Sequence, residues 1–509
     1  MKIILQNVGA LLCLLLVYKG QAQKASSQQM QEWATAQSVK SFKEYREFIS
    51  LPCDAHFPKD MLKNVAWLKN AFSKRNFKVD ILPSEGSPIV LASRTSPKAT
   101  NTVLFYMHFD GQPVDKSKWF QEDPFKPVLK KKDAQGKWSK VPWNSLTQKP
   151  LDQELRFFAR AASDDKGPIM MLITAIDILD QQKISPALNI KVVLDSEEEI
   201  GSPNLAPVVK KYQKLLKADR MIIMDGPRHM SGKPTLMYGC RGNSRVNIKV
   251  FGARVPQHSG HYGNYAPNPA MRLSQLLATM KDKDGRVTIQ GFYDGITLDS
   301  QTQKLLAAVP DNKNQIHKKL GIAEAEKVGK NLQEALQYPS LNVHGLKSAW
   351  VGKNSRTIVP SEAEASIDIR LVPESDPKRL IKLVKQHIQK QGYYIVSAPP
   401  TEAERLKHPK IAMVRSRISS APFRTPVNGA MGQWLRKAMK STFTQAPVQV
   451  RIMGGTVPIA RFINILKIPA VVVPLVNPDN NQHSPNENLR VGNYVDGVRT
   501  CLGILTTKF

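Results

Sequence analysis

Histidine and carboxylate side chains follow four apolar runs of the sequence, and both types of side chain can bind metal ions. They are His108 and Asp110 after NTVLFYM, Asp195, Glu197, Glu198 and Glu199 after LNIKVVL, Asp225 after DRMIIM, and His483 after IPAVVVPLV. Imidazole and carboxylate ligands without thiolates suit zinc, cobalt or manganese. Two such ions about 3.5–4 Å apart, joined by a bridging carboxylate, form a common hydrolytic centre in which Glu198 or Glu199 can act as the general base.

Each of these residues also has a simpler interpretation. A histidine after a strand is usually a loop residue, and an acidic cluster is usually solvated. Asp164 and Asp165 open the amphipathic segment DDKGPIMMLITAIDILDQQ, where acids commonly cap a helix or favour its dipole. The metal hypothesis rests instead on shared position, because open α/β sheets bind ligands outside the carboxyl ends of their strands.

The apolar runs predict the elements that position these side chains. Residues 101–107, 188–194, 219–224 and 468–476 have the length of buried strands, and residues 28–80 look mainly helical. Strands that alternate with helices predict an α/β fold with a mixed, mostly parallel sheet.

The middle of the chain has a different pattern. RVNIKVFGA and AEASIDIRLV alternate as half-buried strands do, and helical segments interrupt them. We therefore predict an α+β lid domain at residues 238–423. It is inserted into a catalytic domain made of residues 23–237 and 424–509.

Composition and the N-terminus bound the class of protein. The chain has 509 residues and a formal net charge of +31, but it contains no recognisable nucleic-acid-binding module. We interpret the basicity as general attraction to anionic surfaces.

Residues 1–22, MKIILQNVGALLCLLLVYKGQA, predict a signal peptide, with an uncleaved anchor as the alternative. The expected location is therefore exported, periplasmic or extracellular, with no transmembrane anchor after cleavage.

Five motifs resemble those of the di-zinc metallopeptidases that include carnosine and non-specific dipeptidases, aminoacylases and glutamate carboxypeptidases. HFDGQP resembles the family's His-x-Asp-x-x-Pro, SEEEIGS its Glu-Glu-x-Gly-Ser, IMDGP its single-aspartate strand end, and NQHSPNE its C-terminal histidine motif. ARAASDDKGP resembles its Gly-Arg-Gly-x-x-Asp-x-Lys-Gly motif, with alanine at 159 and 161 where glycine is usual.

The resemblance implies a role for each residue of the site. His108 and Asp225 would hold one zinc ion, Glu199 and His483 the other, and Asp164 would bridge the two. Glu198 would take a proton from the bridging water and pass it to the leaving amine, while Asp110 would orient His108. The bond from Asp164 to Asp165 is often a cis peptide in this family.

The resemblance also implies how the lid acts. VPQHSGHYGNYAPNPAMRL is similar to the dipeptidase branch, in which His258 reaches across a homodimer and stabilises the oxyanion in the partner's site. His261 is a nearby competitor for that role. SIDIRLVP implies that Arg370 binds a substrate carboxylate, and MGGTVPIARF implicates Gly455 and Thr456 in binding the C-terminal end of the substrate.

The expected function is therefore an exported, zinc-dependent dipeptidase or short-peptide hydrolase with two divalent metal ions. The alternative enzyme is an amidohydrolase of the same family that cleaves N-acyl amino acids. The alternative from another class is a non-catalytic basic binding protein that keeps the fold.

Overall fold

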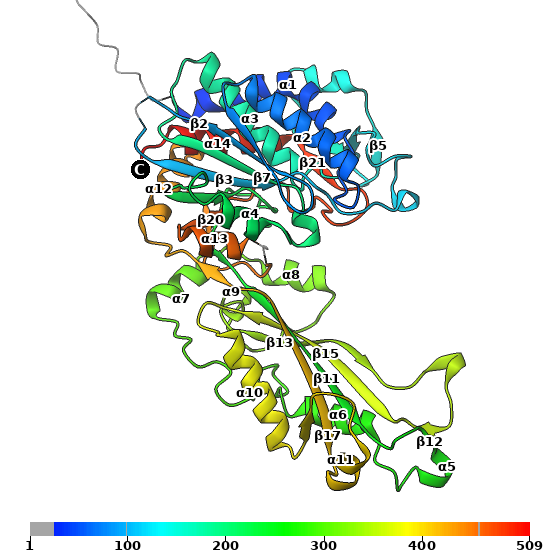
Figure 1. Cartoon of the computed structure of the whole chain (residues 1–509). Helices are drawn as coiled ribbons and strands as arrows, with labels where there is room; N and C mark the ends of the chain where they lie inside the picture. Colours follow the sequence, from blue (N-terminus) through cyan, green and yellow to red (C-terminus); the bar gives the residue numbers. More distant parts are fainter. Residues whose placement is uncertain (1–24, 98, 457–458) are drawn as a thin grey trace, which may run out of the picture.

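The computed structural model describes residues 25–97, 99–456 and 459–509. The predicted signal peptide at residues 1–22 lies outside this range. Two bodies of secondary structure follow one another along the long axis of the molecule, each built on its own sheet (Figure 1). The first is formed by the N-terminal and C-terminal parts of the chain, and the second by its middle.

The first body contains an eight-stranded mixed sheet in the order β1-β2-β7-β3-β8-β20-β9-β19. The pairs β3–β7, β3–β8, β8–β20 and β9–β19 are parallel, and the other three are antiparallel. The strands are β1 (Lys78–Leu82), β2 (Ile89–Arg94), β3 (Thr102–His108), β7 (Asn189–Asp195), β8 (Arg220–Ile223), β9 (Thr235–Met237), β19 (Val448–Val450) and β20 (Ala470–Val472). The predicted α/β fold with a mixed sheet is confirmed.

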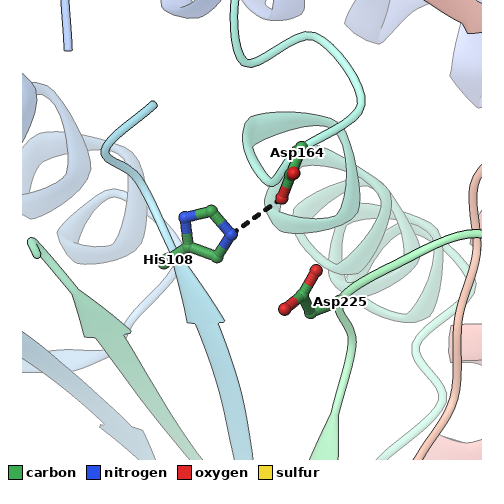
Figure 2. Close-up of side chains that lie close together, drawn as sticks. All are labelled: His108, Asp164 and Asp225. Atoms are coloured by element: carbon green, nitrogen blue, oxygen red, sulfur yellow. Dashed lines mark hydrogen bonds and ion pairs between the residues drawn. The ribbon is translucent and has the colours of Figure 1, made fainter. Parts of the chain in front are cut away.

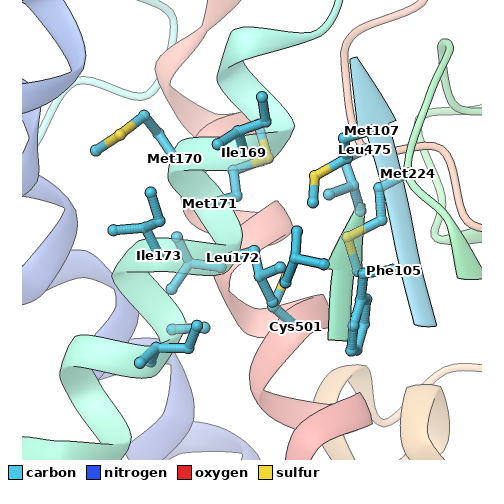
Figure 3. Close-up of a cluster of buried hydrophobic side chains, with 14 of the residues drawn as sticks. Phe105, Met107, Ile169, Met170, Met171, Leu172, Ile173, Met224, Leu475 and Cys501 are labelled. Carbon is cyan, nitrogen blue, oxygen red and sulfur yellow. The ribbon is translucent and has the colours of Figure 1, made fainter. Parts of the chain in front are cut away.

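Helices cover both faces of this sheet, and this explains why its central strands are apolar without alternation. On β3, Phe105 and Met107 pack into one hydrophobic cluster, whereas Leu104 and Tyr106 pack into another on the opposite face. Figure 3 shows Phe105 and Met107 beside side chains of α3 and α14. The covering helices are α1 (Ser27–Ile49), α3 (Lys166–Gln181), α12 (Ala430–Phe443) and α14 (Val491–Thr506) on the first face, and α4 (Leu205–Lys211) and α13 (Ala460–Leu466) on the second.

Two predicted segments differ in extent from the observed elements. The run at 468–476 contributes only the three residues of β20, because Pro469 and Pro474 flank it and proline cannot donate to a strand ladder. The region 28–80 forms α1 and α2 (Pro58–Ser73), and β1 begins at Lys78.

A smaller antiparallel sheet lies in the same body, in the order β21-β6-β4-β5. Its strands are β4 (Val128–Lys132), β5 (Trp138–Lys140), β6 (Arg156–Phe158) and β21 (Asn488–Arg490). The pairing of β6 with β21 brings the segment before α3 beside the segment that follows His483.

The second body is built on a five-stranded sheet in the order β13-β15-β11-β17-β16. The strands are β11 (Gly242–Phe251), β13 (Ser340–Lys347), β15 (Glu362–Leu371), β16 (Tyr394–Val396) and β17 (Ile411–Ser420), and α6 (Pro269–Ala278) and α10 (Pro377–Lys390) pack on the sheet. Shorter elements complete this body: β12 (Gln257–His258), α5 (Ser259–Tyr262), α7 (Ser300–Ala307), α8 (Lys313–Leu320), α9 (Leu332–Ala335), β14 (Ile358–Val359) and α11 (Glu402–Lys407).

One strand pair connects the two bodies. The chain enters the second body through β10 (Gly239–Cys240) and returns through β18 (Phe423–Arg424), and these strands are antiparallel neighbours. A side chain at Gly239 would put its Cβ 2.3 Å from the carbonyl oxygen of Phe423, so the close approach requires glycine.

Candidate metal centre

Three side chains from different elements meet at the carboxyl edge of the large sheet (Figure 2). His108 ends β3, Asp225 follows β8, and Asp164 precedes α3. One ligand atom from each lies within 4.8 Å of the others. The Nε2 atom of His108 is 2.9 Å from Oδ1 of Asp164. Parallel strands deliver their terminal residues to one edge of a sheet, and this is why residues so far apart in the chain converge here.

A second group shares Asp164 with the first. Glu199 lies in the short 3-10 helix η3 (Glu198–Ile200) after β7, and His483 lies in the loop before β21. Ligand atoms of Asp164, Glu199 and His483 all lie within 4.8 Å of one another. His483 Nε2 is 3.1 Å from Oδ2 of Asp164 and 3.1 Å from Oε2 of Glu199. Oδ1 of Asp164 therefore faces the first group, and Oδ2 faces the second. The peptide bond between Asp164 and Asp165 is cis.

Asp110 holds parts of both groups in place. Its Oδ1 atom is 3.3 Å from Nδ1 of His108 and accepts a hydrogen bond from the backbone N–H of Glu198 at 3.1 Å. Its Oδ2 atom accepts one from the backbone N–H of Glu199 at 3.0 Å. A single buried carboxylate thus fixes the ring of His108 and the backbone that carries the two glutamates.

The acidic cluster after β7 divides into two pairs. Asp195 accepts hydrogen bonds from the hydroxyls of Tyr106 at 2.8 Å and Ser202 at 2.6 Å. Glu197 accepts hydrogen bonds from the backbone of Ser87 and the side chain of Asn204. These two acids therefore build the loop, and only Glu198 and Glu199 remain for chemistry.

The carboxylates of the site repel one another. Burial, followed by the charge of Asp164, raises the pKa of Asp225 to about 6 and that of Glu199 to about 7. Burial also raises the pKa of Glu198 well above its usual value. Burial opposes ionisation of Asp164, but hydrogen bonds to His108 and His483 outweigh it and lower the pKa of Asp164. A positive charge placed among these groups would favour their ionised forms.

The donor set fits divalent metal ions. Among the residues that the structure describes, no lysine or arginine forms an ion pair with Asp164, Glu199 or Asp225. Buried carboxylates normally have such a partner or coordinate a metal. Two three-residue groups with a shared carboxylate therefore suit two divalent ions, and imidazole and carboxylate ligands match zinc, cobalt and manganese.

Three of the four predicted substrate-binding residues lie together at the connection between the two bodies. Arg370 on β15 donates a hydrogen bond from Nη1 to Oγ1 of Thr456 at 2.8 Å and from Nε to Asp368 at 3.0 Å. The Thr456 hydroxyl donates to the carbonyl oxygen of Arg241, and the carbonyl oxygen of Gly455 accepts from the N–H of Arg241.

His258 lies apart from this group. It ends β12 and caps α5, at the end of the second body farthest from the eight-stranded sheet (Figure 1). It is exposed, and its Nδ1 atom accepts a hydrogen bond from the backbone N–H of Gly260 at 3.1 Å. The ring of His261 lies 4.9 Å away. The structure does not bring His258 to the metal groups of the same chain.

Sequence reasoning did not single out Gln112 or Arg241, which contact predicted site residues. Gln112 donates a hydrogen bond to Oε2 of Glu199 at 2.8 Å, and its place two residues after Asp110 in HFDGQP was the available signal. Arg241 is buried beside Arg370, and burial and then the charge of Arg370 lower its pKa to about 10. Its signal was the arginine in YGCRGNS, which lies directly after β10.

Comparison with known proteins identifies the family. The sequence profile of peptidase family M20/M25/M40 matches residues 104–507, which is most of the chain. The chain belongs to this family. It is a metallopeptidase, and the resemblance of its five motifs is confirmed. This decides against the alternative of a non-catalytic binding protein.

Individual relatives cover most of the M20 chain described here. A Beta-Ala-His dipeptidase of Mus musculus is 29% identical over 422 residues, which cover 81% of this chain and 78% of the relative. The Cys-Gly metallodipeptidase dug1 of Schizosaccharomyces pombe is 28% identical and covers 81% of both. Among solved structures, the M20 family metallo-carboxypeptidase Sso-CP2 from Sulfolobus solfataricus superposes with a TM-score of 0.72 at 28% identity, covering 91% of this chain and 98% of that one.

The comparisons correct the predicted location. The matched Cys-Gly metallodipeptidases of Schizosaccharomyces pombe, Candida albicans and Saccharomyces cerevisiae are cytosolic, so the prediction of an exported, periplasmic or extracellular protein is wrong. That prediction depended on the hydropathy of residues 1–22, and an apolar run after a lysine does not by itself establish export. Among the described residues, no helix has both the length and the hydropathy needed to cross a bilayer.

Proposed function

We propose that this protein is a zinc-dependent dipeptidase or short-peptide hydrolase. The observation that carries the proposal is the pair of ligand groups that share Asp164, with Glu198 beside them. The relatives named as Beta-Ala-His and Cys-Gly dipeptidases support peptides of two residues as the substrate class. Arg370, which lies at the connection between the two bodies, would supply the positive charge that binds the terminal carboxylate of a peptide.

The proposed ligands follow from the two groups. His108, Asp164 and Asp225 would hold one ion, and Asp164, Glu199 and His483 the other. When bound, two divalent ions supply Lewis acidity and lower the pKa of water at the site. Zinc fits this donor set and has no redox chemistry of its own, so we propose it as the native metal.

Glu198 is the proposed general base. A carboxylate oxygen of Glu198 takes the proton of the attacking water as the water oxygen bonds to the peptide carbonyl carbon. The same carboxyl group then gives that proton to the amine nitrogen as the carbon–nitrogen bond breaks. Burial, which raises the pKa of Glu198, favours a group that can hold the proton between these two steps.

The second body completes the proposed site as a lid. We propose domain limits of 23–237, 238–423 and 424–509, with the middle segment moving about the β10–β18 pair. Arg370, Gly455 and Thr456 bind the C-terminal end of the substrate. A homodimer formed through the lid brings His258 of one protomer to the site of the other, where its imidazole stabilises the oxyanion.

Metal content measured together with hydrolysis tests this proposal. The purified protein should contain about two zinc ions per chain and should cleave dipeptides until a chelator removes the metal. Zinc added back should restore cleavage. Faster hydrolysis of N-acetyl amino acids than of a dipeptide set would identify the protein as an amidohydrolase instead. Absence of metal and of activity after zinc addition would contradict both.

A further inference from the structure

Glu487 is a buried carboxylate with an unusual concentration of hydrogen bonds. Its side chain is 1% exposed, and both of its oxygens accept from the segment before α3. Oε1 accepts from the N–H and hydroxyl of Ser163, both at 2.9 Å, and from the N–H of Asp164 at 3.0 Å. Oε2 accepts from Nη1 of Arg160 at 2.8 Å and from the N–H of Ala161 at 3.0 Å.

These contacts join two segments that carry proposed ligands. Asp164, the residue shared by the two ligand groups, is held through its own backbone N–H. Glu487 itself lies four residues after His483, and its carbonyl oxygen accepts a hydrogen bond from the N–H of Ala159 at 3.2 Å. The position of Asp164 is therefore coupled to the segment that presents His483.

The loop needs such a partner because its backbone is not regular. Ala161 has a φ of 58°, in the left-handed region that an alanine adopts only at a cost of about 1–2 kcal/mol. This is one of the two positions where the family motif has glycine. Buried N–H groups without an acceptor would add about 1–3 kcal/mol each. Glu487 accepts from three of these N–H groups and so stabilises the conformation that presents Asp164.

We propose that Glu487 is a positioning residue for the metal centre, holding Asp164 between the two ions. This inference rests on the proposed function. Glu487 performs on this side of the site the task that Asp110 performs on the other, where one carboxylate fixes the backbone of Glu198 and Glu199. A purely structural role as counter-ion of Arg160 would account for only one of its five side-chain hydrogen bonds.

Glu487→Gln tests the proposal without changing the size of the side chain. Both oxygens of Glu487 face N–H donors, so the amide group of glutamine must turn its own NH₂ toward one set of them. The zinc affinity of metal-free protein, measured by competition with a chromophoric chelator, should fall by about 10–100-fold. The visible spectrum of the cobalt-substituted protein should change as well, because the ligand field depends on where Asp164 lies.

Two further variants make the result decisive. Ser163→Ala removes a single hydroxyl donor to Glu487 and should lower zinc affinity by a smaller factor, with the fold retained. Glu44→Gln is the matched control: Glu44 pairs with Arg75 and contacts no proposed ligand, so it should lower stability and leave zinc affinity and the cobalt spectrum unchanged.

Unchanged zinc affinity and an unchanged cobalt spectrum in folded Glu487→Gln protein would overturn the inference. If that variant does not fold, Ser163→Ala decides, and wild-type affinity in Ser163→Ala would overturn it. Failure of the unmodified protein to bind zinc or cobalt would overturn the proposed function and this inference together, so the two failures are distinguishable.

Discussion

The two histidines proposed for chemistry occupy opposite environments. His108 is fully buried at the end of β3, and both of its ring nitrogens face carboxylates. His258 is exposed at the end of β12, and its hydrogen bond is to the backbone of Gly260. One chain therefore assembles the metal end of the site by its own folding. The oxyanion end has no such support, and we propose that substrate and a second protomer provide it.

The largest effect on turnover should come from a substitution at the metal end of the site. Glu198→Ala should reduce turnover by about 10²–10⁴-fold, because the proton acceptor is lost while the ligands remain. Metal content measured on the same protein should stay near that of wild type. Glu199→Ala is the contrasting variant and should lose metal from the group that includes His483. Near-normal turnover in Glu198→Ala would show that another group is the base.

The exposed histidine should give the next largest effect. His258→Ala should lower kcat by about 10²–10³-fold, the usual cost of removing an oxyanion donor, with metal content unchanged. His261→Ala is the matched control, since its ring lies beside His258, and it should retain activity.

Hybrid dimers sharpen the comparison further. Co-expression of His258→Ala and Glu198→Ala chains should restore activity that neither variant shows alone, because one site of the hybrid has both intact groups. Hybrids as inactive as the parents would contradict action across a dimer.

An intermediate effect on kcat/KM is expected for Arg370, which lies at the connection between the two bodies. Arg370→Met should reduce kcat/KM for dipeptides by about 10–100-fold, chiefly through KM, since charge-assisted hydrogen bonds contribute about 1.5–3 kcal/mol. Arg245→Met is the control: Arg245 is exposed on the neighbouring strand β11, and its loss should leave steady-state kinetics unchanged. Equal effects of the two substitutions would show that Arg370 acts only through its positive charge and does not bind the substrate carboxylate directly.

The smallest effect concerns stability alone. Burial raises the pKa of Glu44, but hydrogen bonds from Arg75 and Lys74 outweigh burial, so the pKa of Glu44 is lowered. A lowered carboxyl pKa stabilises the fold at pH values above 4.5, and this contribution is lost as the pH falls through the lowered pKa.

Glu44→Gln should therefore cost about 1 kcal/mol of unfolding free energy at neutral pH, and its difference from wild type should narrow below pH 4.5. Urea unfolding of metal-free protein at several pH values measures this difference. A difference in unfolding free energy that does not depend on pH would show that the charge of Glu44 is not its source.

Strand ends were easier to predict from the sequence than the directions of the side chains that follow them. The strand ends that carry His108 and Asp225 could be predicted because a buried strand is a continuous apolar run and its polar successor marks its end. In the acidic cluster, by contrast, the pattern could not separate Asp195 from Glu199. That separation depends on Tyr106 and Ser202, which only the folded chain brings to Asp195.

The roles of Glu487 and Arg241 were hidden for a similar reason. In the motif NQHSPNE, nothing distinguishes Glu487 from a solvated acidic residue of a loop. Its role depends on the pairing of β6 with β21, which brings it into contact with the segment before α3. The error in location has another origin, because the prediction rested on the hydropathy of residues 1–22 alone.

The β10–β18 pair also bears on how such a molecule can change over time. Because the second body departs at Gly239–Cys240 and returns at the adjacent Phe423–Arg424, its two ends lie side by side. A segment with adjacent ends can be exchanged for another, or replaced by a tight turn, without rerouting the strands that carry the proposed ligands. Replacement of this one contiguous module would leave the proposed metal ligands and Glu198 in place, whereas the proposed contributions of Arg370 and His258 would change with it.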